Sequence, residues 1–347
     1  MRFYTHQHKH YCGIDLHART MYVCMLDPSG PIVVHKNLRA TPEDFSRVIA
    51  PYRADLVVAG EGLFTWYWLS DLCARAGSAF VLGHALSRKA SHGGKAKNAK
   101  IDAHNIAVLV RGGRLPRAYV YPPEMGATRD LLRRRCPLMR QRAELLAPMQ
   151  TTNSPYHLPE LGKTRADKAN REGGAEHCPE PRVRKTIELD GALSDHYDKL
   201  VSEVALSITR PATGHDAQSC SRRQSGPGGG QLLALVLRYE SPDSSRFPRV
   251  PDFVSYCRLV TCAKESAGTR HGRAGQKMGT PQLTWACAAA AVLGLRQTQP
   301  GKEDCATLER KPGKGQALTV RAPKVARAVY PRLTREHAFA LTRFVTA

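Results

Sequence analysis

The sequence has no long hydrophobic run and few acidic residues for its length. No stretch approaches the roughly 18 consecutive apolar residues that a membrane-spanning helix needs. The first residues, MRFYTHQHKHY, contain no apolar core, so we expect neither a signal peptide nor a membrane association. Acidic residues number 30 against 52 lysines and arginines, a formal net charge of +22. Such an excess predicts an anionic partner, and a nucleic-acid backbone fits best.

The ten cysteines lack the paired CxxC spacing of many zinc sites. Cys257 and Cys262 are the closest pair, and with His271 they offer only a weak alternative metal set. Others, such as Cys24 and Cys73, lie in apolar segments, where cysteine behaves as a small hydrophobic residue. We therefore expect reduced thiols and a cytoplasmic protein.

The N-terminal third alternates short β-rich and helical segments. Strands are predicted at 11–16, 21–26, from 32, at 56–59 and at 79–82, and helices at 42–52, 64–76 and 99–110. Thr41 followed by Pro42 and two acids is typical of a helix start. Three antiparallel strands, then helix, strand, helix, strand and helix, is the element order of the ribonuclease-H fold. We therefore predict an α/β ribonuclease-H-like domain over residues 1–122.

The remainder of the chain is predicted to be mostly helical. Leu/Arg-rich helical spacing after residue 123 and a second helix at 187–206 predict a helical hairpin connector over residues 123–210, with Pro137 and Pro148 as expected kinks. A mostly α C-terminal domain is predicted over residues 211–347. Its helices are expected at 232–239, from 283 and at 322–333, with a Gly/Ser/basic loop at 264–279.

Three acids lie on or next to predicted elements that could bring them together in the fold. Asp15 lies on the first strand, Glu61 just after the buried fourth strand, and Asp102 on the helix after a basic segment. If the first and fourth strands are neighbours, the three carboxylates converge and would bind Mg²⁺ or Mn²⁺ for phosphodiester chemistry. The alternatives are a turn-forming Asp15, a solvated Glu61 and an Asp102 that merely favours a helix N-terminus.

Two motifs in the C-terminal half allow phosphate contact. The run 225–230 (SGPGGG) before a helix either cradles a phosphate with its amides or forms a flexible turn. Ser266 stands among the cations Lys264, Arg270 and Arg273, so it either attacks phosphorus or belongs to a plain Ser/Gly loop.

Basic side chains also flank the acids and follow the connector. As the net charge is so high, we expect these cations to contact phosphates rather than form only a solvated face. They are Arg88, Lys89, Lys95, Lys97, Lys100, Arg133, Arg134 and Arg135.

Several segments together resemble the DEDD transposases of the insertion-sequence IS110 family. They are 11–20 (YCGIDLHART), 58–61 (VAGE) with 65–69 (TWYWL), and 97–103 (KNAKIDA). Further on, 253–259 (FVSYCRL) through 266–268 (SAG) to Gly279 is similar to the family's C-terminal transposase domain, which follows a helix-hairpin-helix-like turn.

The resemblance implies a RuvC-like N-terminal domain whose acids bind metal and a C-terminal serine that links covalently to DNA. In this sequence the resemblance assigns the metal-binding role to Asp15, Glu61 and Asp102 and the covalent role to Ser266. It also implies a bacterial enzyme that excises and inserts its element, with DNA ends and target, a structured guide RNA and a homo-oligomer as expected partners.

The chain departs from the family in several places. Alanine stands at position 99, where an aspartate three residues before the last acid is usual, and the glycine turn reads GPGGG at 226–230. Prolines at 137, 148, 281, 323 and 331 fall in expected helices. An active transposase and a transposase-derived nucleic-acid-binding protein without nuclease activity both remain open. An actin-like-fold sugar kinase also begins with Gly-Ile-Asp, but a second phosphate motif and an adenosine site are missing.

Overall fold

The computed structural model describes residues 2–61, 65–84, 98–151, 179–215, 230–260, 263–273, 279–297 and 314–335. The chain divides into two compact units, Met1–Glu124 and Met125–Ala347. None of the described helices is long and apolar enough to cross a membrane.

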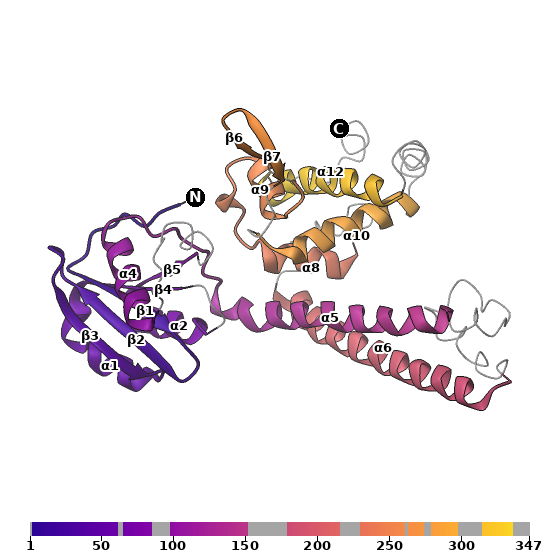
Figure 1. Cartoon of the computed structure of the whole chain (residues 1–347), viewed down its shortest axis with the longest axis horizontal. Coiled ribbons are helices and arrows are strands. Elements are labelled where there is room, and N and C mark those ends of the chain that lie inside the picture. Colours follow the sequence, from indigo (N-terminus) through magenta and orange to yellow (C-terminus); the bar gives the residue numbers. More distant parts are fainter. Residues whose placement is uncertain are drawn as a thin grey trace. The chain divides into compact units, whose positions relative to one another are not determined.

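The first unit is a five-stranded mixed sheet with helices on both faces (Figure 1). Its strands are β1 (His10–Leu16), β2 (Thr20–Leu26), β3 (Ile32–Arg39), β4 (Leu56–Glu61) and β5 (Ala79–Gly83), in the order β3-β2-β1-β4-β5. The pairs β1–β2 and β2–β3 are antiparallel, and β1–β4 and β4–β5 are parallel. The predicted strands are confirmed, with ends that shift by a few residues.

The described residues of this unit also form the helical segments α1 (Pro42–Ile49), the 3-10 helix η1 (Ala50–Asp55), α2 (Tyr67–Arg75) and α4 (Ala99–Arg111). Their ends follow from local chemistry. The Thr41 side chain accepts a hydrogen bond from the Asp44 amide at 3.3 Å, and Asn98 caps α4 by accepting one from the Ile101 amide at 2.8 Å. Gly77, with a φ of +68°, follows α2 and leads into β5.

The two faces of the sheet carry different apolar clusters because successive side chains of a strand alternate between faces. On β1, Cys12, Ile14 and Leu16 pack with residues of α1 and α2. On the other face, Tyr11 belongs to a cluster with Ile106 and Val110 of α4. Odd-numbered residues of β1 therefore face α4.

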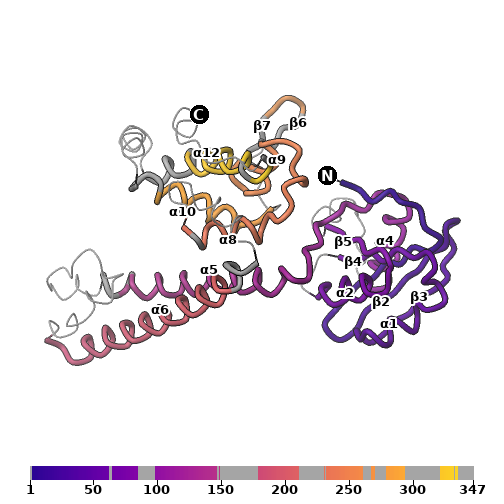
Figure 2. The backbone as a smooth tube through the Cα atoms, turned by 180° about the vertical axis from the view of Figure 1, so that it is seen from behind, coloured from indigo at the N-terminus to yellow at the C-terminus, as the bar shows by residue number. Residues whose placement is uncertain are grey.

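The second unit begins with a long helical pair. Helices α5 (Pro123–Thr151) and α6 (Pro181–His215) run side by side (Figure 2) and are joined by an ion pair between Arg142 and Asp198. The buried positions 183, 187, 194, 201 and 208 of α6 are spaced by four and seven residues, the period of a coiled-coil seam. α5 includes both Pro137 and Pro148, and α6 is longer than predicted at both ends.

The rest of the second unit contains α8 (Gln231–Glu240), η3 (Ser244–Arg246), α9 (Val250–Tyr256), β6 (Ala263–Ser266), β7 (Thr269–Arg273), α10 (Pro281–Gln297) and α12 (Lys314–Arg335). Helices α8, α9, α10 and α12 pack around one apolar core. Pro281 begins α10, a position that tolerates proline, whereas Pro323 and Pro331 lie inside α12.

The loop predicted at 264–279 was wrong over its first half, which is a β-hairpin. β6 and β7 pair antiparallel and are joined by Ala267 and Gly268, whose φ values are +50° and +74°. A two-residue turn with positive φ at both positions matches the twist of a hairpin. Alanine at the first position concealed this signal, because asparagine or glycine is usual there.

Candidate functional site

Asp15 occupies the end of β1 on the face that α4 covers. Its side chain is 8% exposed, and one oxygen lies 3.1 Å from Nε2 of His17, which is two residues further along and 57% exposed. Burying a charged carboxylate costs free energy unless hydrogen bonds or opposite charges compensate for the lost water. Burial raises the pKa of Asp15 above its ordinary value, and the nearby imidazole of His17 acts against that shift.

Glu61 approaches Asp15 from the neighbouring strand. β1 and β4 run parallel, and Gly13 pairs with Ala59 and Ile14 with Gly60, so the ends of both strands are level. Paired residues of neighbouring strands share a face, which puts Glu61 on the side of Asp15. The two acids are therefore not on opposite faces of the sheet.

Asp102 approaches the same place from the first turn of α4. This helix can lie against the sheet because Gly13 has no side chain: a Cβ at Gly13 would overlap the carbonyl oxygen of Ala103 and the amide nitrogen of Ala107, and would lie 2.9 Å from the Cα of Ala107. Ala103 and Ala107 are both fully buried. Backbone contact between strand and helix thus brings the start of α4 to the end of β1.

The charges of the three acids act on one another. The negative charges of Asp102 and Glu61 both add to the rise in the pKa of Asp15. Repulsion of this kind is relieved by a cation, and carboxylate oxygens are the hard ligands that Mg²⁺ and Mn²⁺ prefer. The donor set therefore fits a divalent ion. Among the residues that the structure describes, however, no three acids, histidines or cysteines already form a group tight enough to hold one.

Several basic residues named from the sequence fall outside the described ranges. These are Arg88, Lys89, Lys95 and Lys97. Lys100, in the first turn of α4, is exposed. Arg133 is instead engaged within the protein, since its Nε donates to Glu240 at 2.7 Å. Arg133 therefore binds a buried carboxylate of its own unit, and its contact with phosphate stays a prediction.

Arg134 and Arg135 follow on α5, on different faces of the helix. Burial lowers the pKa of Arg135. Arg134 is exposed.

Ser266 ends β6 and pairs with Thr269 across the hairpin turn. The turn residues Ala267 and Gly268 are exposed. Lys264 lies on β6, and Arg270 and Arg273 on β7, so the backbone carries all four residues on one hairpin.

The weak zinc alternative finds no support in the described residues. Cys262 lies outside them, and the thiol of Cys257 is buried in hydrogen-bond contact with that of Cys287, which raises the pKa of Cys257. Of the glycine run at 225–230, only Gly230 is described, as the N-cap of α8.

Two site residues were missed from the sequence. His17 contacts Asp15, and Gly13 admits α4. His17 stands two residues after Asp15 at a strand end, where i and i+2 share a face, so a sequence signal was present. The role of Gly13 had no such signal, because its partners lie about ninety residues away.

Two family models match the chain. Residues 12–152 match the IS110-type DEDD model, described as a transposase, and residues 220–305 match the model described as transposase of the IS116/IS110/IS902 family. The matched segments follow one another and together span well over half of the chain. No curated protein is similar enough to count as a match.

Proposed function

The chain belongs to the IS110 family of DEDD transposases, and we propose that it serves a bacterial insertion sequence by cutting and rejoining DNA strands. One observation supports the proposal: Asp15 lies on the face of the sheet that α4 covers, and the charges of Asp102 and Glu61 both raise its pKa. The β1–β4 pairing and the element order support a ribonuclease-H-like, RuvC-like fold for residues 1–122. Residues 123–210 would be the connector and residues 211–347 the C-terminal transposase domain.

Asp15, Glu61 and Asp102 are the residues that would hold Mg²⁺ or Mn²⁺. When bound, such an ion stabilises negative charge on the attacking and leaving oxygens of a phosphodiester. The protein contributes rigidity. Asp15 is fixed on a central strand, and Thr65 donates a hydrogen bond of 3.4 Å to the carbonyl of Leu16, which ties the segment after Glu61 to the end of β1.

Ser266 would supply the covalent step. Its hydroxyl oxygen would bond to phosphorus while the bond from phosphorus to a sugar oxygen breaks, and the proton lost by serine would balance the one gained by the sugar. Lys264, Arg270 and Arg273 would neutralise the phosphate, as their position on the same hairpin supports. DNA ends, a DNA target, a structured guide RNA and further copies of the chain are the proposed partners.

The test is strand cleavage of a plasmid carrying matched element ends, with Mg²⁺ and the cognate RNA supplied. We expect Asp15→Asn to abolish cleavage and Ser266→Ala to abolish the covalent protein–DNA product. Two controls remove similar groups from exposed places: Glu43→Gln in α1 and Ser255→Ala in α9. Cleavage by Asp15→Asn equal to that of the natural chain would refute the proposed site.

A further inference from the structure

The hairpin that carries Ser266 belongs to an excursion whose two ends are tied together. In the sequence, the hairpin lies between α9 and α10. The Thr280 amide donates to the Tyr256 carbonyl at 3.0 Å, and the Thr284 hydroxyl donates to the Cys257 carbonyl at 2.7 Å. These bonds join the two stems from which the excursion departs.

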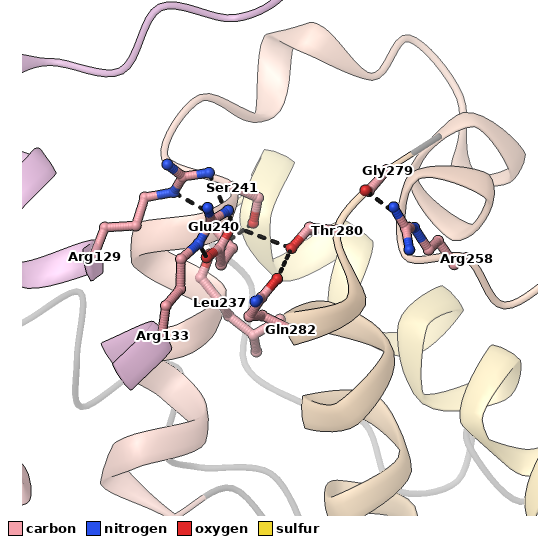
Figure 3. Close-up of polar contacts among 9 residues, drawn as sticks. All are labelled: Arg129, Arg133, Leu237, Glu240, Ser241, Arg258, Gly279, Thr280 and Gln282. Atoms are coloured by element: carbon pink, nitrogen blue, oxygen red, sulfur yellow. Dashed lines mark hydrogen bonds and ion pairs between the residues drawn. The ribbon is translucent and has the colours of Figure 1, made fainter. Parts of the chain in front are cut away.

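A third tie comes from Arg258. Its Nε donates to the carbonyl of Gly279 at 3.1 Å, as Figure 3 shows, so a charged side chain spans from the first stem to the second. Gly279 can lie so close only because it lacks a side chain: its φ is +95°, and a Cβ would overlap the carbonyl oxygen of Tyr256.

Arg258 adopts a backbone conformation that is unfavourable for a residue with a side chain. It follows α9 with a φ of +57°, and the amides of Arg258 and Leu259 donate to the carbonyls of Ser255 and Val254 at 2.9 and 3.2 Å. This is the helix ending that normally takes glycine. A strained residue persists where the surroundings or a function require its side chain. Here the side chain provides the link to Gly279.

The second stem is also anchored to the connector. The Thr280 hydroxyl lies 3.2 Å from Oε2 of Glu240, which is 2% exposed and bound by Arg133 and Arg129 of α5 (Figure 3). The base of the excursion is therefore held both to itself and to a long helix.

We propose that Arg258 is a positioning residue for Ser266: it ties together the two stems that flank the β6–β7 hairpin in the sequence, so that the serine is presented in one place. The inference rests on the proposed role of Ser266. Because Arg258 acts through Gly279, it needs no contact with DNA.

Arg258→Gly separates positioning from stability. Glycine relaxes the backbone at this φ, so the thermal midpoint should stay the same or rise. Loss of the guanidinium removes one of the three ties between the stems, here called the clasp, and so weakens it. Amide hydrogen exchange over 263–273 should then quicken on the order of tenfold, the effect of one charge-assisted hydrogen bond. The yield of covalent Ser266–DNA product should fall by a similar factor. Arg258→Lys, which can still donate to Gly279, should recover part of both.

The matched control is Arg249→Ala, which removes an arginine from the other end of α9, where it forms an exposed ion pair with Asp252. It should change neither exchange nor yield. Unchanged hydrogen exchange in Arg258→Gly would show that Arg258 does not hold the stems together. Faster hydrogen exchange with an unchanged yield of covalent product would show that Arg258 does not position Ser266. If the natural chain forms no covalent product, the proposed function of Ser266 fails, and hydrogen exchange alone then decides whether the clasp exists.

Discussion

Gly13→Ala tests the contact that brings the acids together. The added methyl would overlap the carbonyl oxygen of Ala103 and the amide nitrogen of Ala107, and both atoms belong to the backbone of α4. A flexible side chain could turn away, but a helix backbone can only move as a unit. We therefore expect α4 to shift away from β1 and to carry Asp102 away from Asp15.

The cost follows from the packing. Inserting a methyl group into a full core costs about 1–3 kcal/mol when neighbours can adjust. Since the atoms here are backbone, we expect about 3 kcal/mol, near the upper end of that range. For a unit of this size that lowers the thermal midpoint by roughly 10 °C. Ala107→Gly should not rescue the variant, because it removes none of the overlapping atoms.

Gly60→Ala is the matched control on the adjacent strand. A Cβ at Gly60 meets only ring atoms of Phe80 at 3.9 Å, an ordinary contact. Its effect should stay within about 1 kcal/mol, because losing glycine's freedom in the unfolded chain offsets any small crowding. Denaturation followed by circular dichroism, with Mn²⁺ titration calorimetry, compares the two. Equal midpoints and equal metal affinity for both variants would refute the close approach of α4.

Four further predictions follow from the charges. Ala99→Asp adds a carboxylate one turn before Asp102, so Mn²⁺ should bind more tightly and cleavage should increase; equal cleavage with and without the change would make a fourth acid dispensable. Because the pKa of Asp15 is raised, the folded protein binds the proton of this carboxyl more tightly than the unfolded chain does. The metal-free protein therefore loses stability as the pH rises above 3.8, the ordinary pKa of an aspartate. Asp15→Asn should therefore be more stable than the natural chain at neutral pH without metal, and the difference in denaturation midpoint between the two should shrink in acid. A difference that does not change with pH would contradict this. Glu240→Gln removes the negative charge that binds the buried Arg129 and the partly exposed Arg133, and should cost about 3–5 kcal/mol in urea unfolding. Asp252→Asn, in an exposed ion pair, should cost under about 1 kcal/mol. Affinity for DNA, measured by anisotropy, should fall steeply with salt because bound cations release counterions, and a flat response would count against phosphate binding.

Local sequence determined most of the first unit. Alternating apolar residues, the cap at Thr41 and the unbroken apolar run of β4 act between neighbours along the chain, so the strands and helices could be predicted. The positions of Asp15, Glu61 and Asp102 on three different elements were also visible, since each lies within or next to one strong pattern. The hairpin at 263–273 was missed because Ala267 adopts a φ that alanine rarely takes.

Only the tertiary structure decided how these pieces meet. Whether α4 touches β1 at Gly13 depends on a packing contact between residues far apart in the sequence. The same is true of Glu240, which accepts hydrogen bonds from Arg133 more than a hundred residues earlier and so links α8 to α5. Propensity and periodicity describe a residue by its neighbours in the chain, whereas burial and charge pairing depend on what the folded chain brings beside it.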